Sequence, residues 1–230
     1  YINQSKQMAK NFHSEVVVAS YDDHIRKLIP GYELVHQQIE AILSTELPEN
    51  AHILIVGCGT GYELSYLLQQ HPNWTFTAID PSAAMLEQAR KHLASIGVEQ
   101  RVQFIQCTTQ ELNQQDTFDA ALAILVAHFI PEPQKSDFFQ AIYQSLKAGG
   151  IALTYDLMQP EGENELKVMQ KMAQQTGLSV QQSENMLARL QQDFFLISAE
   201  DSNELLTKVG FKQRKIYSQI MNYYGFLLRK

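Results

Sequence analysis

The sequence predicts an α/β domain in which helices cover a largely parallel β-sheet. Short apolar runs alternate with amphipathic stretches between Ile53 and Tyr155, and this alternation is typical of βαβ units. A glycine-rich turn follows the first apolar run directly. The chain has 230 residues, which is enough for one such domain with an additional helical segment.

The overall composition is that of a soluble folded protein, with 45% hydrophobic and 19% charged residues. The net charge of −7 makes a nucleic-acid partner unlikely, because a phosphate backbone requires clustered Lys and Arg. The one local basic cluster, Lys212, Arg214 and Lys215, is interpreted as a solvated strand edge.

Location and metal content are predicted from what the chain lacks. It has no run of about 18 apolar residues that could span a membrane, and its first residues are too polar for the core of a signal peptide. Cys58 and Cys107 cannot form a disulfide framework, and no His/Cys cluster has the spacing of a zinc site. A cytoplasmic protein without membrane or metal is therefore expected, with a leader removed before Tyr1 as the alternative.

The first fifty residues are predicted to be helical. Apolar residues recur at helical spacing between Tyr32 and Leu43, and Pro30-Gly31 should separate two helices. No strand pattern precedes Ile53. Residues 1–50 are therefore predicted to form an N-terminal helical lid, and residues 51–230 the main domain.

Five apolar runs in the main domain have the length and composition of buried strands. The helix before the last of them should begin at Ser136 or Asp137 and end at Gly149-Gly150. A polar turn is expected at residues 107–110. The predicted strands are Ile53–Val56, Thr75–Ile79, Val102–Ile105, Phe118–Leu125 and Ile151–Tyr155.

The strand pattern disappears between about residues 159 and 198. Two amphipathic helices are predicted there as a cap inserted after the fifth strand. A further helix around Leu205 and Leu206 precedes two more strand candidates, residues 215–220 and 223–228. These two strands are close enough in sequence to pair as a hairpin.

The turn after the first strand contains Gly57, Gly59 and Gly61 between a buried strand and the start of a helix. Glycines allow a tight turn and a close approach of the backbone to a ligand, and the helix start offers N–H groups to an anion. Asp80 ends the next strand about 20 residues later, where a carboxylate can accept hydrogen bonds from ribose hydroxyls. The pattern predicts a nucleoside-containing ligand.

Three segments carry a family resemblance: V-G-C-G-T-G, A-I-D-P-S with M-L shortly after it, and L-K-A-G-G before the fifth strand. Together they resemble the class I S-adenosylmethionine-dependent methyltransferases over about residues 51–156. The resemblance implies a Rossmann-like sheet of seven strands in the order 3-2-1-4-5-7-6 with strand 7 antiparallel, and S-adenosyl-L-methionine as cofactor. The cofactor contacts that it implies are Gly57, Cys58, Gly59, Gly61, Asp80 and Pro81.

Residues 18–33 and the V-G-F at residues 209–211 also resemble the carboxy-S-adenosylmethionine synthases. Those enzymes, which serve tRNA wobble-uridine modification, form a carboxylated sulfonium from S-adenosylmethionine and prephenate. This second resemblance implies that Tyr32 reaches the cofactor from the N-terminal helices. The further cofactor positions that it implies are Thr108, Thr109 and Ile124.

The chain departs from the synthases at the positions that matter for the carboxylate. Leu187 stands where they have an Arg, and Arg189 is nearby but out of register. Thr108 replaces their acidic residue, and Ile124 their Asn. Because an apolar side chain cannot neutralise a carboxylate as a guanidinium does, ordinary S-adenosylmethionine is the predicted cofactor.

Methyl transfer from a sulfonium is an in-line displacement, so the protein mainly aligns the acceptor and excludes water. If the acceptor has to lose a proton, His128 is the first candidate base, because it follows the fourth strand at the carboxyl edge of the sheet. A purely structural histidine is the alternative. Further candidates of the same kind are Tyr21, His24, Tyr155 and Asp156.

The predicted function is a methyltransferase that acts on a small-molecule acceptor. Two other classes stay open: a nicotinamide-dependent oxidoreductase, which the G-x-G-x-G spacing disfavours, and a non-catalytic protein that binds S-adenosylmethionine. Whether the chain forms a homodimer also stays open.

Overall fold

The computed structural model describes residues 21–230, apart from the side chains of residues 21–24 and of Gln191. The described residues form one sheet of order β3-β2-β1-β4-β5-β7-β6. β7 runs antiparallel to both of its neighbours and all other pairs are parallel, so the predicted order and direction are confirmed. The strands are β1 (His52–Val56), β2 (Thr75–Ile79), β3 (Val102–Ile105), β4 (Phe118–Ile124), β5 (Leu146–Leu157), β6 (Gln213–Ile220) and β7 (Tyr223–Arg229).

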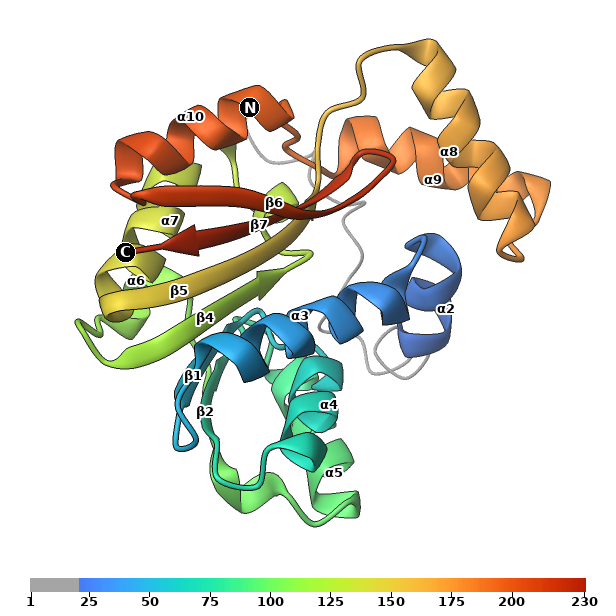
Figure 1. Ribbon diagram of the computed structural model, residues 1–230. Helices are drawn as coiled ribbons and strands as arrows, with labels where there is room; N and C mark the ends of the chain where they lie inside the picture. The colour runs from blue at the N-terminus through green and yellow to red at the C-terminus, as the bar shows by residue number, and fades with distance from the viewer. Residues whose placement is uncertain (1–20) are drawn as a thin grey trace, which may run out of the picture.

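Helices cover both faces of the sheet (Figure 1). One face packs against α3 (Tyr32–Glu46), α4 (Tyr62–Gln70) and α5 (Ala83–Ser95). The other packs against α6 (Thr109–Leu112), α7 (Glu132–Ser145) and α10 (Ala199–Val209). The other helical elements are α2 (Tyr21–Leu28), α8 (Glu163–Gln175), α9 (Val180–Gln192) and the short 3-10 turns η1 (Glu99–Arg101) and η2 (Ala127–Phe129).

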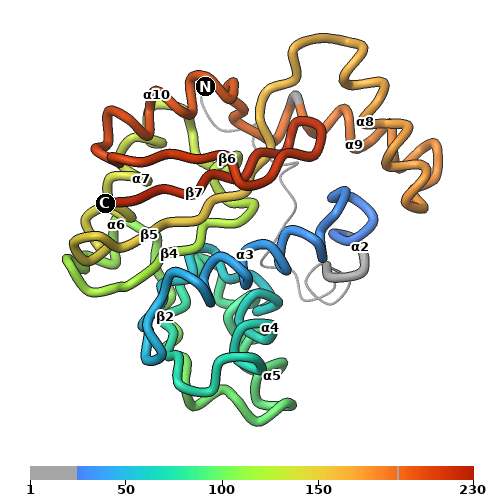
Figure 2. The backbone as a smooth tube through the Cα atoms, viewed as in Figure 1, coloured from blue at the N-terminus to red at the C-terminus, as the bar shows by residue number. Residues whose placement is uncertain are grey.

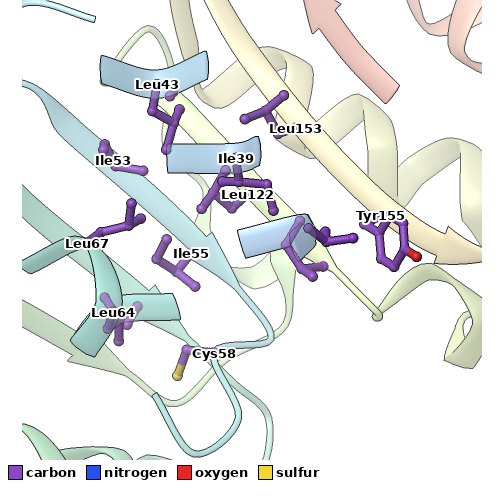
Figure 3. Close-up of a cluster of buried hydrophobic side chains, with 14 of the residues drawn as sticks. Ile39, Leu43, Ile53, Ile55, Cys58, Leu64, Leu67, Leu122, Leu153 and Tyr155 are labelled. Atoms are coloured by element: carbon purple, nitrogen blue, oxygen red, sulfur yellow. The ribbon is translucent and has the colours of Figure 1, made fainter. Parts of the chain in front are cut away.

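The central strands are mainly apolar because both of their faces are buried. In β1, Ile53 and Ile55 point to the face covered by α3 and α4, whereas Leu54 and Val56 point to the other face. Figure 3 shows Ile53 and Ile55 beside Leu43 of α3 and Leu64 of α4. This packing fixes the position of the carboxyl ends of the strands.

The predicted break between the first two helices is confirmed. α2 ends at Leu28 and α3 begins at Tyr32, with Gly31 between them at a φ of 71°. A Cβ on Gly31 would lie 2.4 Å from the Cδ1 atom of Ile220, so both the backbone angle and the space favour glycine. Residues 1–20 of the predicted lid lie outside the described residues.

Two predicted boundaries around α7 are wrong. The helix begins at Glu132, before Ser136 and Asp137, because Pro133 already fits the first turn, where a missing N–H costs nothing. It ends at Ser145, and Gly149-Gly150 lies inside β5 instead of ending the helix.

The glycine pair in β5 serves a close approach between strands. A Cβ on Gly150 would lie 3.1 Å from the carbonyl oxygen of Asp119 on β4. The register between β4 and β5 shifts just there, between Phe118 and Ala120. A bulge of this kind is a common place for glycine in a strand.

The predicted cap is confirmed as the helical pair α8 and α9, which projects from the sheet near α2 (Figure 2). Buried Met169 of α8 and Leu190 of α9 join the same apolar cluster as α3. The hydroxyl of Thr176 at the end of α8 donates to the carbonyl of Lys27 in α2, at 2.5 Å. The cap and the N-terminal helices therefore meet beyond the carboxyl edge of the sheet.

The terminal hairpin is also confirmed, and β6 is the edge strand that carries Arg214 and Lys215. Of the helices formed by residues 21–230, none combines the length and apolarity that crossing a membrane requires.

Candidate active site

The three glycines of the loop after β1 all have positive φ, at 64° for Gly57, 52° for Gly59 and 84° for Gly61. At Gly57 a Cβ would lie 2.7 Å from Val126, and at Gly61 it would lie 3.1 Å from Ala89. At Gly59 nothing lies within 4 Å. Gly57 and Gly61 are therefore required by packing, whereas Gly59 leaves the backbone open to a ligand.

Asp80 is buried beside this loop, with 7% of its surface exposed. Its Oδ2 accepts from the N–H of Gly59 at 3.0 Å, and its Oδ1 accepts from the N–H of Ser82 at 2.8 Å. Ser82 in turn caps α5 by accepting from the N–H of Met85 at 3.3 Å. The carboxylate thus ties the glycine loop to the start of α5.

These features fit the cofactor predicted from the sequence. A carboxylate can accept several hydrogen bonds, so Asp80 can accept from ribose hydroxyls as well as from the backbone. Gly59 provides the open backbone beside it. The contact between Asp80 and a ribose stays a prediction.

The other predicted cofactor positions lie along the same edge of the sheet. The adjacent strands β3, β2, β1 and β4 place Thr108, Asp80, Gly57 and Ile124 at or just after their carboxyl ends. Thr108 caps α6 in a capping box with Glu111, and Thr109 is buried next to it. Pro81 is exposed, and its carbonyl accepts from Gln106.

Cys58 is buried in the middle of the glycine loop. Burial, reinforced by the carboxylates of Asp80 and Glu63, raises the pKa of its thiol well above the ordinary value. The side chain is therefore a neutral packing group rather than a nucleophile.

Tyr32 lies in an aromatic cluster at the start of α4. Its ring centroid is 4.5 Å from that of His36 and 5.1 Å from that of Tyr62, the first residue after Gly61. His36 bridges to α4 as well, with Nε2 3.1 Å from the Glu63 carboxylate. Tyr32 therefore packs beside the start of the helix that follows the glycine loop, and its contact with a cofactor stays a prediction.

A cavity of about 290 Å³ lies between the N-terminal helices, the cap and the strand ends. α2 supplies Ile25 and Leu28, and α9 supplies Met186 and Leu190. Leu125 lines the cavity directly after Ile124, so the cavity adjoins the predicted cofactor edge. This mainly apolar space is suited to a small acceptor.

His128 lines this cavity and is paired with a buried carboxylate. It lies in η2, and its Nδ1 contacts Oδ1 of Asp156 on β5 at short range. Oδ2 of Asp156 accepts from the N–H groups of Ala127 at 2.5 Å and His128 at 3.2 Å. Leu157 donates its N–H to Oδ1 at 2.8 Å. The structure thus brings two of the sequence-predicted residues together as an Asp–His pair.

Tyr155, another predicted candidate, does not join this pair. Tyr155 points into the core on the α3 side of the sheet, and burial raises the pKa of its hydroxyl (Figure 3). The side chain of His24 lies outside the described residues, as does that of Tyr21.

Three residues of the site were not singled out from the sequence. Phe129 and Phe194 surround His128, with ring centroids 4.1 and 4.6 Å from the imidazole. Buried Lys135 donates to the carbonyl of Ala127, and burial lowers the pKa of its ammonium while nearby Asp156 opposes that shift. The burial of Lys135 could have been predicted from the sequence, because this residue lies on the same face of α7 as Phe138, Phe139 and Ile142.

Leu187 and Arg189, both in the cap helix α9, have different surroundings. Leu187 is half-buried against the apolar core, whereas Arg189 lines the cavity. The Nε of Arg189 donates to the carboxylate of Asp193 at 2.8 Å. The residue at the synthase arginine position is therefore a packing residue.

Comparison with known proteins concerns the domain that carries this site. Residues 53–150 match a methyltransferase domain family. The carboxy-S-adenosyl-L-methionine synthase of Campylobacter curvus is 24% identical over 220 residues, covering 94% of this chain and 93% of the relative. The synthase of Campylobacter lari is 29% identical over 170 residues, covering 73% and 69%.

Among solved structures, an O-methyltransferase family protein from Burkholderia thailandensis superposes with a TM-score of 0.69 at 14% identity, covering 99% of this chain. This chain spans 64% of that protein, and between 57% and 66% of two further solved chains that it resembles. At this identity the likeness concerns the fold.

The sheet order and the matched domain define a class I methyltransferase fold. Residues 53–150 form a methyltransferase domain, and most of the chain is similar to carboxy-S-adenosyl-L-methionine synthases.

Proposed function

We propose that this protein transfers the methyl group of S-adenosylmethionine to a hydroxyl or similar protic group of a small acceptor bound in the cavity, with His128 as general base. The observation that carries this proposal is the His128–Asp156 pair at the wall of the cavity. The cofactor supplies a methyl group already activated by a sulfonium, so the protein has to position the acceptor and take its proton.

The hydrogen bonds of Asp156 define the role of His128. The carboxylate accepts from the backbone N–H groups of Ala127, His128 and Leu157, which stabilises its ionised form. An ionised carboxylate can only accept, so Nδ1 of His128 donates to it. Nε2 is then the nitrogen that can accept a proton from the acceptor.

The residues around His128 keep most of the solvent away from its ring. Only 8% of the residue is exposed, and Phe129 and Phe194 pack around its ring. The N–H of Phe195 donates to the carbonyl of His128 at 2.8 Å, which joins η2 to the segment after α9. Asp156 acts as a positioning residue that holds the tautomer and the ring orientation.

The synthase activity named for the relatives is the second candidate. Arg189 favours it, because this cation lines the cavity. Leu187 disfavours it, because the position of the synthase arginine is occupied by an apolar residue that packs into the core. Methyl transfer is therefore the function that the site supports best.

We also propose a cytoplasmic location and a small-molecule partner. The net charge of −7 disfavours nucleic acid, and two cysteines suit a reducing compartment.

The direct test is turnover of methyl-labelled S-adenosylmethionine with a panel of hydroxylated acceptors. His128→Gln should lower kcat by about 100-fold or more, while the affinity for S-adenosylhomocysteine stays the same. His52→Gln is the matched control, because His52 lies at the opposite end of the sheet and hydrogen-bonds Thr77 at 3.0 Å. An unchanged kcat in the His128 variant would remove the general base from the proposal.

A further inference from the structure

Most of the described residues that line the cavity are apolar. α2 contributes Ile25 and Leu28, α9 contributes Met186 and Leu190, and Leu157 extends from the end of β5. Phe194 lies beside His128 at the inner end. A ligand in this space gains most of its binding free energy from burial of apolar surface.

The two basic side chains among the described lining residues already have carboxylate partners. Nδ1 of His128 is paired with Asp156. The guanidinium of Arg189 is held by Asp193, whose side chain is only 4% exposed. The positive charge of Arg189 is therefore compensated from within the protein.

The two amides of the lining are engaged in the cap itself. Oε1 of Gln182 accepts from the N–H of Ser179 at 2.9 Å in the capping box of α9. Oδ1 of Asn185 accepts from Nε2 of Gln181 at 3.2 Å. Both amides thus contribute to the ends and surface of the helix.

We infer that the acceptor is a neutral, largely apolar molecule about the size of two fused rings, with one hydroxyl that meets His128. This inference rests on the proposed function of the same cavity. A carboxylate or phosphate on the acceptor would be desolvated without an uncompensated cation to receive it, which carries a large penalty.

The size follows from the volume. An apolar cavity of about 150 Å³ lined by Leu, Ile and Phe is known to hold one benzene molecule. The cavity here, at about 290 Å³, is about twice as large, and Leu, Ile and Phe make up most of its described lining. A bicyclic alcohol therefore matches both the volume and the chemistry of the lining.

The test compares two probes by calorimetry, in the presence of S-adenosylhomocysteine: 2-naphthol and 6-hydroxy-2-naphthoate. They share the two-ring scaffold and the hydroxyl, and differ by one carboxylate. The neutral probe should bind about tenfold more tightly or better. Equal affinity, tighter binding of the acid, or no binding of either probe would overturn the inference.

A size variant adds a second arm. Met186→Trp should lower the affinity for 2-naphthol by about tenfold. The affinity for phenol, which has one ring, should change by less than about threefold. Ala188→Trp adds the same ring to an exposed position of α9 that does not line the cavity, and should change neither affinity. If the Met186 variant lost affinity for 2-naphthol and phenol to the same extent and still bound S-adenosylhomocysteine, the assigned size would be wrong.

The outcomes separate the inference from the proposed function. Binding of 2-naphthol without transfer of label would support the inference and count against methyl transfer to this class. Transfer of label to an anionic acceptor instead would support a methyltransferase and overturn the inference.

Discussion

The two halves of the carboxyl edge of the sheet are each organised around a buried carboxylate, but their partners differ. Asp80, after β2, accepts from the backbone N–H groups of Gly59 and Ser82. Asp156, near the end of β5, accepts from backbone N–H groups and also from the ring of His128. We therefore expect the first carboxylate to shape a loop for a ligand, and the second to orient a side chain for chemistry.

The largest effect is expected on the Asp156 side. An Asn at this position has one acceptor oxygen, which should take the N–H groups of Ala127 and His128, as Oδ2 does now. Its NH₂ then replaces Oδ1 and faces both Nδ1 of His128 and the N–H of Leu157. His128 would then be held in the wrong tautomer, with Nε2 protonated. Asp156→Asn should lower kcat for label transfer by about 100-fold or more, with little change in cofactor affinity.

Asp119→Asn is the matched control for that variant. Asp119 is also a carboxylate on a central strand and accepts from the N–H of His52 at 2.8 Å, but it lies at the amino end of β4. The kcat of the Asp119→Asn variant should stay close to that of the wild type. If both variants lose activity equally, Asp156 contributes to stability and not to the orientation of His128.

A smaller effect is expected on the Asp80 side. Asp80→Ala removes the acceptor for ribose hydroxyls and leaves the N–H groups of Gly59 and Ser82 without their partner. Cofactor affinity should fall by about tenfold or more, since each charge-assisted hydrogen bond contributes roughly 1.5 to 3 kcal/mol. Equilibrium dialysis with S-adenosylhomocysteine measures this, and circular dichroism checks the fold. An affinity equal to that of Asp119→Ala would exclude Asp80 from the binding site.

The smallest effect is expected beside Asp156, at Tyr155, which points to the opposite face of the sheet. Its hydroxyl is buried without a hydrogen-bond partner among the described residues. Tyr155→Phe should therefore leave the free energy of unfolding unchanged or raise it by about 1 kcal/mol at pH 7. Tyr224→Phe removes a hydroxyl that accepts from Gln219 at 2.7 Å, and should not stabilise.

The pH dependence of the stability of Tyr155→Phe gives a second measurement. Burial raises the pKa of Tyr155 above its unfolded value, so its neutral form is favoured in the folded state. The stability linked to this group is fully present below about pH 10 and is lost as the pH rises further, because the unfolded chain then releases the proton first. Urea titrations at pH 7 and at about pH 11 should show that the free energy of unfolding falls less for Tyr155→Phe than for the wild type.

The cofactor half of the site could be predicted from the sequence because its determinants are local. Gly57, Gly59 and Gly61 lie within five residues, and Asp80 ends the next strand. Each strand of the central sheet was also predictable, since burial on both faces leaves an uninterrupted apolar run. The errors fell at helix ends, where Pro133 starts α7 earlier than Ser136 suggests.

The acceptor half could be predicted only in fragments. His128 and Asp156 were both candidates, but the contact between them joins residues 28 positions apart and depends on the pairing of β4 with β5. The cavity draws its walls from α2, η2, β5 and α9, so no single segment contains its pattern. Phe194 and Lys135 have their roles only through this tertiary arrangement.

The central claim, that the protein uses the ordinary methyl donor, is tested most directly by the cofactor that it retains. Mass spectrometry of the nucleoside released from the purified protein should show S-adenosylmethionine or S-adenosylhomocysteine, because Leu187 packs into the core where the synthases have their arginine. Recovery of the carboxylated sulfonium, or its formation from prephenate in vitro, would contradict the account and would assign the carboxylate to Arg189.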